Sequence, residues 1–413
     1  MLDKRDKSQY GNQKNLSTQH YLVKMLHKIL VSVDRSSQHE AFCAILHMVD
    51  WAQAFDRQSH KLGVQSFIDN GVRPALIPVL VNFFQDRKMR VKWKGHISTF
   101  RNLNGGGPQG GTLGIEEYLS QSNDNCDFLP DDEKFKYIDD LSMLEIINLI
   151  SIGIASYNFK AHVASDIGVK NSYLPAENIQ SQQFINSIEQ WTDRKEMKLN
   201  SEKSKFMLIN FTKNYQVNTR LYMEEKLLTQ VSKTRLLGII LRDDLSFKSN
   251  TEFITKKAYK RMSILHKLYQ FDVPVEDLVN IYILYIRSVL EQSAVVWHSS
   301  ITKGEQMDIE RVQKCAFRII LKEKYDGYEN ALNICNLDSL KARRKQLCLK
   351  FARKSIKYEK TQDIFPLNSN ASSARVGEKF EVTFARTNRL ANSAVPYMQR
   401  LLNAHEKQKK RTK

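Results

Sequence analysis

Two adjacent aspartates, Asp139 and Asp140, interrupt an otherwise apolar segment that runs from Phe135 to Leu144. Hydrophobic residues on both sides predict a β-hairpin that carries the two carboxylates at its turn. Like charges held this close repel each other unless a cation lies between them. Because hard oxygen ligands favour Mg²⁺ or Mn²⁺ over zinc, the pair predicts a divalent metal site. An exposed, solvated turn is the alternative for an isolated Asp-Asp pair.

A third carboxylate, Asp50, ends the apolar run Phe42–Val49, which predicts a buried strand. If this strand neighbours the hairpin of Asp139 and Asp140, three carboxylates converge and can hold two divalent ions. Two such ions activate a 3′-hydroxyl and neutralise a pyrophosphate leaving group in nucleotidyl transfer. The interpretation depends on that adjacency.

Glycine is concentrated in the segment Leu103–Gly114, where five glycines lie between Gly105 and Gly111. They would let a backbone pass close to a large ligand. The segment is not a Walker loop, because no Gly-Lys-Ser or Gly-Lys-Thr follows. A glycine-rich surface turn is the alternative.

The three elements follow one another as Asp50-x-x-x-Ala54-Phe55-Asp56, Gly107-Pro-Gln-Gly110 and Tyr137-Ile-Asp-Asp140. This order resembles the palm of reverse transcriptases, and among them the enzymes of non-LTR (LINE-type) retrotransposons. Later segments resemble the family's fourth palm motif, its primer-grip hairpin, and its thumb and post-thumb helices. In that order they are Asn200–Leu208, Lys233–Ile239, Tyr285–Trp297 and Ile309–Ile320.

The resemblance implies an α+β fold: a polymerase right-hand palm, with an antiparallel sheet and packed helices, followed by an α-helical thumb and C-terminal region. It divides the chain into a fingers remnant (1–40), palm (41–250), thumb and post-thumb (251–367) and basic tail (368–413). Helices are predicted over Pro74–Phe84, which a proline opens, and after Thr251, where apolar residues recur every three or four positions. Apolar runs predict strands over Phe42–Val49, Phe135–Ile138 with Leu141–Leu144, Lys205–Phe211 and Leu236–Leu241.

Functional residues carry over from the resemblance position by position. It implies that Asp50, Asp139 and Asp140 hold two Mg²⁺ ions, with Mn²⁺ as an alternative, and that Lys203 protonates or screens the pyrophosphate. Phe55 would be a steric gate that crowds a ribose 2′-hydroxyl; taken alone, it also fits a core aromatic. Isolated lysines are usually solvated surface charges. The remaining implied substrate contacts are Gly107, Pro108, the nucleotide-positioning Gln109, Gly110, Tyr137 and Lys205.

Basic residues outnumber acidic ones, 63 to 45, which gives a net charge of +18. Most of this excess lies in residues 301–413, which hold 25 Lys and Arg against 12 Asp and Glu. Such a charge favours a polyanionic partner, with nucleic acid before an acidic membrane face. A solvated charged face is the alternative for the basic cluster of 341–345. The implied nucleic-acid contacts are Gly238, Lys341, Arg343, Arg344 and Lys345.

The resemblance implies an RNA-directed DNA polymerase that extends a DNA or RNA primer on an RNA template with deoxynucleoside triphosphates, and a ribonucleoprotein with its own transcript. The alternative is a truncated descendant that only binds nucleic acid. A group II intron or telomerase-like function is less well supported, because the helices after the palm resemble those of LINE-type elements. Fewer than 50 residues precede Asp50, so the chain alone is expected to polymerise weakly or not at all.

The sequence has no long apolar stretch and no secretory signal. We therefore expect an intracellular location, nuclear or cytoplasmic, and no membrane partner. Five scattered cysteines predict buried free thiols.

Overall fold

A computed structural model describes residues 5–37, 39–107, 111–151, 179–212, 217–368 and 378–411. The chain divides into two compact units. The first unit contains Met1–Tyr21 and Ser36–Val231, and the second contains Leu22–Arg35 and Ser232–Lys413. The predicted α+β class is confirmed, whereas the assignment of fingers, palm, thumb and tail remains a prediction.

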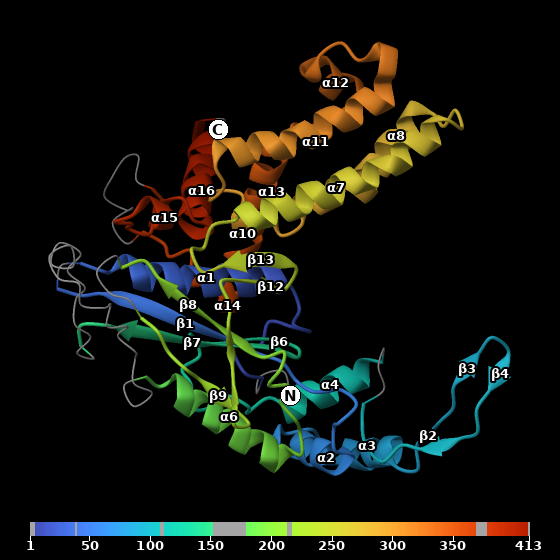
Figure 1. Cartoon of the computed structure of the whole chain (residues 1–413), viewed down its shortest axis with the longest axis vertical. Helices are drawn as coiled ribbons and strands as arrows, with labels where there is room; N and C mark the ends of the chain where they lie inside the picture. The colour runs from blue at the N-terminus through green and yellow to red at the C-terminus, as the bar shows by residue number, and fades with distance from the viewer. Residues whose placement is uncertain are drawn as a thin grey trace, which may run out of the picture. The chain divides into compact units, whose positions relative to one another are not determined.

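The first unit is built on a five-stranded sheet with the order β11-β8-β1-β7-β6 (Figure 1). Its central strand β1 (Phe42–Val49) is buried on both faces, as its largely apolar run predicts. Antiparallel neighbours flank it: β7 (Asp140–Asn148) on one side and β8 (Lys205–Asn210) on the other. The edge strand β6 (Lys134–Tyr137) pairs antiparallel with β7, and β11 (Thr229–Gln230) pairs parallel with β8.

Helices complete the core of the first unit. The predicted helix over Pro74–Phe84 is confirmed as a 3₁₀ turn, η2 (Pro74–Leu76), that continues into α3 (Ile77–Phe84). The described part of this unit also contains α2 (His60–Asp69), α4 (Thr112–Gln121), α6 (Ser181–Lys195) and the start of α1 (Thr18–Asp34). The buried face of α6 joins the same hydrophobic cluster as residues of β1 and β7.

Short hairpins project from this core. One is formed by β9 (Tyr222–Met223) and β10 (Lys226–Leu227). Beyond α3, two stacked pairs of strands form a longer extension (Figure 1). Its outer and inner pairs are β3 (Lys92–Trp93) with β4 (His96–Ile97), and β2 (Lys88–Met89) with β5 (Arg101–Asn102).

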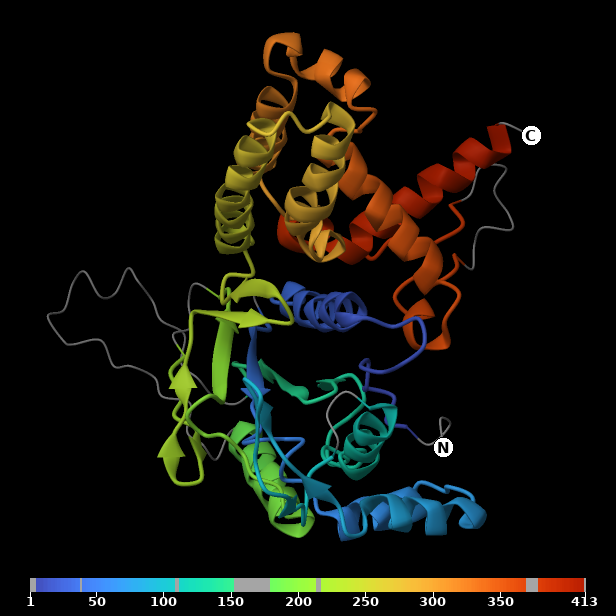
Figure 2. The same ribbon diagram turned by 90° about the vertical axis from the view of Figure 1, so that its right-hand side faces the viewer.

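The second unit is largely helical, as the apolar spacing after Thr251 predicts (Figure 2). The long helices α7 (Lys248–Tyr269) and α11 (Lys303–Leu321) pack against each other. A π-helical segment, Tyr282–Arg287, joins α8 (Val275–Ile281) to α9 (Ser288–Glu291). The remaining elements are most of α1 (Thr18–Asp34), β12 (Lys233–Leu236), β13 (Ile239–Arg242), α10 (Ala294–Trp297), η5 (Lys322–Lys324), α12 (Tyr328–Ile334), α13 (Leu340–Ser355), α14 (Glu359–Gln362), α15 (Asn388–Ala391) and α16 (Ala394–Arg411).

The single strand predicted over Leu236–Leu241 is wrong. Leu236 pairs with Ile239, so the segment folds back on itself as the β12–β13 hairpin. The two turn residues, Leu237 and Gly238, have positive φ angles of 44° and 91°. This is the combination of a type I′ turn. The apolar run conceals it, whereas the resemblance of Lys233–Ile239 to a primer-grip hairpin anticipates a hairpin here.

The five cysteines carry free thiols, and all except Cys315 are buried, close to the prediction. Across the described ranges, no helix is both long and apolar enough to cross a membrane.

We expect Gly238→Ala to lower the free energy of unfolding by about 1–2 kcal/mol, because a side chain at this φ is strained. An added Cβ would also lie 2.6 Å from the Gln292 amide nitrogen. The matched control is Gly304→Ala in α11, where the nearest atom to an added Cβ is 3.8 Å away. Urea denaturation followed by circular dichroism should show a loss only for Gly238→Ala; equal midpoints would contradict the role of the turn.

Candidate functional site

The register of β1 with β7 brings three carboxylates to one edge of the sheet. Val49 pairs with Leu141, so Asp50, the next residue, leaves β1 where Asp140 begins β7. Asp139 lies in the two-residue turn before Asp140. The negative charges of Asp139 and Asp50 both act on Asp140, which shows that the three groups lie within electrostatic range. The register therefore brings these three residues to the same edge of the sheet.

Both carboxyl groups of the doublet are perturbed. Burial of the carboxyl group, and then the charges of Asp139 and Asp50, raise the pKa of Asp140 to about 6. Burial, and then the charge of Asp50, also raise the pKa of Asp139, although a backbone hydrogen bond opposes the change. Although their carboxyl groups are partly buried, Asp139 and Asp140 are exposed to solvent when the whole residue is considered. A cation at this edge would relieve the repulsion and favour the ionised forms.

The donor chemistry of this edge suits a hard cation. Asp50, Asp139 and Asp140 offer only carboxylate oxygens, which are the ligands that Mg²⁺ and Mn²⁺ prefer. Among the residues that the structure describes, however, no group of three or more His, Cys, Asp or Glu side chains is arranged so that it could hold a metal ion. The assignment of metal ligands remains a prediction that requires side-chain movement on binding.

The turn that carries Asp139 is strained and externally supported. Ile138 has a φ of 58°, which is unfavourable for a β-branched residue. Its N–H donates to Gln9 Oε1 at 3.0 Å, and the same oxygen accepts from Gly11 N at 2.8 Å. Gly11 passes so close that a Cβ there would lie 2.6 Å from Ile138 Cγ1. The N-terminal segment therefore holds the turn in place.

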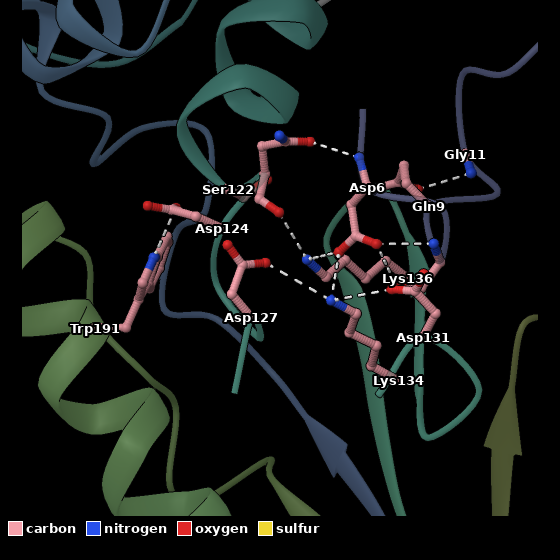
Figure 3. Close-up of polar contacts among 12 residues, drawn as sticks. Asp6, Gln9, Gly11, Ser122, Asp124, Asp127, Asp131, Lys134, Lys136 and Trp191 are labelled. Atoms are coloured by element: carbon pink, nitrogen blue, oxygen red, sulfur yellow. Dashed lines mark hydrogen bonds and ion pairs between the residues drawn. The ribbon is translucent and has the colours of Figure 1, made fainter. Parts of the chain in front are cut away.

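A buried ion pair fastens the same segment to β6 (Figure 3). Lys136 Nζ lies 2.5 Å from the Asp6 carboxylate, and Lys134 Nζ lies 3.4 Å from it. Burial alone would raise the pKa of Asp6, but the charge of Lys136 and hydrogen bonds from Lys136 and Ser8 lower it to about 2. Backbone hydrogen bonds from Tyr10 N to Lys136 O and from Lys136 N to Ser8 O extend the attachment. Sequence patterns give no sign of this support, because the segment is short and polar.

A second buried polar cluster, which the sequence analysis missed, ties α6 to the sheet. His47 Nε2 on β1 lies 2.8 Å from Ser181 Oγ at the start of α6. The Ser181 hydroxyl donates to Glu145 on β7, which also accepts from Gln180 N at 2.8 Å. Burial lowers the pKa of His47 to about 3, so its ring is neutral at physiological pH. The only signal in the sequence is a polar residue inside each of two apolar strands.

The fourth motif lies at the same edge as the carboxylates. Asn200 N donates to Asp50 O at 2.9 Å, and Asp50 N donates to Ser204 Oγ at 3.0 Å. Lys205 begins β8 opposite Met48. Lys203, between these anchored positions, is exposed. Both lysines therefore lie on the part of the fold that carries Asp50.

Phe55 and Tyr137 are also near this edge. The partly buried ring of Phe55 packs against Tyr118, with 5.0 Å between ring centroids. The charges of Asp139 and Asp140 act on Tyr118, which sequence reasoning did not single out. Tyr137 pairs with Asp140 across the hairpin.

The described part of the glycine-rich segment packs against the chain itself. Gly106 N donates to Gln58 O at 2.8 Å, and Gly107 N donates to Phe55 O at 2.9 Å. A Cβ on Gly105 would lie 2.9 Å from Gln58 O, and one on Gly107 would lie 2.5 Å from Gln58 Oε1. These glycines pass close to the segment after Asp50. Their expected contact with a ligand remains a prediction. Pro108, Gln109 and Gly110 lie outside the described residues.

The implied nucleic-acid contacts on α13 differ from one another. Lys341 and Lys345 are exposed, and Arg343 Nε lies 3.2 Å from Glu291. Arg344, in contrast, is fully buried, and its Nε donates to His298 Nδ1 at 3.2 Å. As placed, Arg344 cannot reach a phosphate, because it lies one turn after the buried Leu340 and one before Cys348 on the inward face of the helix. Gly238 occupies the β12–β13 turn.

Comparison with known proteins identifies two relatives, both of Drosophila melanogaster, although no protein-family model matches the chain. One is a probable RNA-directed DNA polymerase from transposon BS, 23% identical over 256 residues, which cover 60% of this chain and 25% of the relative. The other is a probable RNA-directed DNA polymerase from transposon X-element, 26% identical over 235 residues, which cover 56% and 23%. They confirm the predicted resemblance to reverse transcriptases of transposons. The chain spans about a quarter of their length.

Among solved structures, the chain is similar to apo telomerase from Candida tropicalis, with a TM-score of 0.37 and 14% identity over 85% of this chain and 55% of that one. It is also similar to telomerase from the same yeast in complex with a TWJ fragment of telomeric RNA. That match has a TM-score of 0.36 and 10% identity over 97% of this chain and 51% of the other.

We expect Gln9→Leu to speed hydrogen exchange at the Ile138 amide by at least about fivefold, because the variant removes the acceptor of that N–H. The matched control is Gln65→Leu, whose amide group bonds Asp69 on the exposed face of α2. Residue-resolved exchange should change only in the Gln9 variant. An unchanged rate at Ile138 would mean that the turn does not depend on the N-terminal segment.

A second prediction concerns the stability conferred by neutral His47. The pKa of His47 is about 3 in the folded chain, whereas its ordinary value is 6.5. As the pH falls below 6.5, His47 therefore binds a proton in the unfolded chain but not in the folded one. Folding therefore weakens with acidification. Between pH 7 and pH 5 the wild-type free energy of unfolding should fall by about 2 kcal/mol more than that of His47→Leu. Denaturation at both pH values checks this, and parallel losses in the two proteins would contradict it.

Proposed function

We propose that the chain is the polymerase region of a transposon reverse transcriptase, which extends a DNA or RNA primer on an RNA template with deoxynucleoside triphosphates. The observation that carries the proposal is the β1–β7 register, which sets Asp50 beside Asp139 and Asp140. The relatives support the same reaction class, since both are named probable RNA-directed DNA polymerases.

In this proposal Asp50, Asp139 and Asp140 hold two Mg²⁺ ions, or Mn²⁺ in their place. The bound ions would favour ionisation of the primer 3′-hydroxyl and neutralise charge on the pyrophosphate. The chain contributes a carboxylate cluster whose mutual repulsion favours cation binding, on a turn fixed from the N-terminal segment. The exposed ammonium of Lys203 is available to protonate or screen the leaving pyrophosphate.

Substrate selection would fall to side chains beside the carboxylates. Phe55 is braced by Tyr118 and can therefore exclude a ribose 2′-hydroxyl with little movement of its ring. Tyr137 and Lys205 would contact the primer end and the triphosphate. Gly107, Pro108, Gln109 and Gly110 complete the proposed nucleotide contacts, with Gln109 against the incoming nucleotide and the template base.

Nucleic acid is the proposed macromolecular partner. The net charge of +18 provides affinity for phosphate that is independent of sequence. The β12–β13 turn at Gly238 and the exposed Lys341 and Lys345, with Arg343 at the edge of the same helix, are the proposed contacts in the second unit. The working assembly would be a ribonucleoprotein with the element's own transcript, in the nucleus or the cytoplasm.

The test is primer extension on an RNA template with Mg²⁺, compared between the wild type, Asp140→Asn and the exposed control Asp193→Asn on α6. Since extension by the chain alone is expected to be weak, we expect Asp140→Asn to abolish whatever extension the wild type shows and the control to keep the wild-type rate. Binding of primer–template should be the same in all three proteins. Equal extension by Asp140→Asn would overturn the site assignment.

Metal binding gives a readout that does not require turnover. Mn²⁺ binding, followed by the decrease of the free-ion signal in electron paramagnetic resonance, should weaken in Asp140→Asn and not in Asp193→Asn. A wild type that binds primer–template but neither takes up Mn²⁺ nor extends the primer would support the alternative, a reverse-transcriptase descendant that only binds nucleic acid.

A further inference from the structure

The extension beyond α3 consists entirely of exposed residues from Lys88 to Asn102, and we call this segment the basic arm. Two short antiparallel ladders shape it, and a two-residue turn at Lys94 and Gly95 closes it. Both turn residues have positive φ, 45° and 86°, as a type I′ hairpin requires. The arm thus has a defined shape but no hydrophobic core of its own.

Charge and apolar character alternate along the first strand of the arm. Cations occupy the even positions from Lys88 to Lys94, and Met89, Val91 and Trp93 occupy the odd ones. The structure also brings cations against the exposed rings, since Lys94 Nζ lies 6.0 Å from the centroid of the Trp93 ring and Arg90 lies over the Phe100 ring. With five Lys and Arg and no Asp or Glu in Lys88–Asn102, no acidic residue of the arm offsets this charge.

Two aromatic rings stand in solvent on this arm. Trp93 is 71% exposed and Phe100 is 59% exposed. The Arg90 guanidinium carbon lies 4.8 Å from the centroid of the Phe100 ring. The three other tryptophans of the chain, Trp51, Trp191 and Trp297, are all buried. Exposed rings beside cations are the combination found where bases stack and phosphates bind.

The composition of the arm favours unpaired nucleotides over a protein or duplex nucleic acid as its partner. A protein partner would have to cover a row of lysines, which protein–protein interfaces tend to exclude from their centre. Duplex nucleic acid would satisfy the cations but offer no base faces to Trp93 and Phe100. Unpaired nucleotides satisfy both, because phosphates meet the cations and bases stack on the rings.

We propose that the basic arm is a binding site for single-stranded nucleic acid, with phosphates on the cations of its first strand and bases on Trp93 and Phe100. The inference deepens the proposed function, on which it rests for the identity of the strand, an unpaired part of the RNA template. Binding measured in EDTA without nucleotides is independent of polymerisation, so a failed extension assay leaves the arm testable.

The test measures the affinity of a fluorescein-labelled oligouridine of about 20 nucleotides by anisotropy over a range of salt concentrations. An aromatic variant carries Trp93→Ala with Phe100→Ala, and a charge variant carries Lys88→Gln, Arg90→Gln and Lys92→Gln. The control removes the same charge from exposed positions of the first unit outside the arm: Lys61→Gln, Arg73→Gln and Lys226→Gln. Circular dichroism should be unchanged in all three, because none of the substituted side chains is buried.

We expect the aromatic variant to bind about tenfold more weakly with an unchanged salt slope. The charge variant should lower the slope by about 2, which is roughly 0.7 for each phosphate that the arm no longer neutralises, while the control keeps the wild-type slope. Because Trp93 is the exposed tryptophan, oligouridine should also quench tryptophan emission in the wild type and not in Trp93→Phe.

Three results would overturn the proposal. The first is an aromatic variant that binds as tightly as the wild type. The second is a charge variant that matches the control in its salt slope. In the third, the arm variants still bind oligouridine but lose another interaction. Loss of binding to phosphatidylserine vesicles would identify a membrane as the partner, and loss of self-association would identify a second copy of the chain.

Discussion

The candidate site depends on the antiparallel pairing of β1 with β7, in which Val49 lies opposite Leu141. A slip of one residue would turn every side chain of one strand to the other face and separate Asp50 from Asp140. Apolar patterning cannot prevent such a slip here, because both strands are buried on both faces. The buried polar groups can. His47 and Glu145 share one Ser181 hydroxyl, and in another register each would be buried without that partner.

The edge formed by β1 and β7 also carries unfavourable interactions. Asp50, Asp139 and Asp140 repel one another, and Ile138 holds a backbone conformation that costs of order 1–3 kcal/mol. Support comes from the N-terminal segment, through the side chain of Gln9 and the buried Asp6 ion pair with β6. Strain and like charge maintained by surrounding contacts are typical of functional sites, since stability alone would remove them.

The sequence predicts those parts of the fold that local patterns encode. Continuous apolar runs identify β1 and β8, and a proline marks the start of the helix before Phe84. The Asp139–Asp140 pair in an apolar frame identifies the hairpin. The same patterns fail where an apolar run hides a turn, as at Leu237 and Gly238, because apolar character does not record φ.

Longer-range features are missed for a different reason. Arg344 resembles one more cation of a basic cluster, yet the helical period turns it inward beside His298. Gly105–Gly107 also packs its backbone against the chain after Asp50, a contact that its composition does not reveal. The role of Gln9 depends on a contact across more than a hundred residues. These features follow from tertiary contacts, which a single sequence does not specify.

The central claim is that one register unites three carboxylates into a metal-binding edge, and anomalous diffraction from crystals of the chain soaked in Mn²⁺ tests it most directly. The account predicts an anomalous peak about 2.1 Å from carboxylate oxygens of both Asp50 and Asp140. A peak bound elsewhere, or carboxylates from the two strands that share no ion at saturating Mn²⁺, would contradict it.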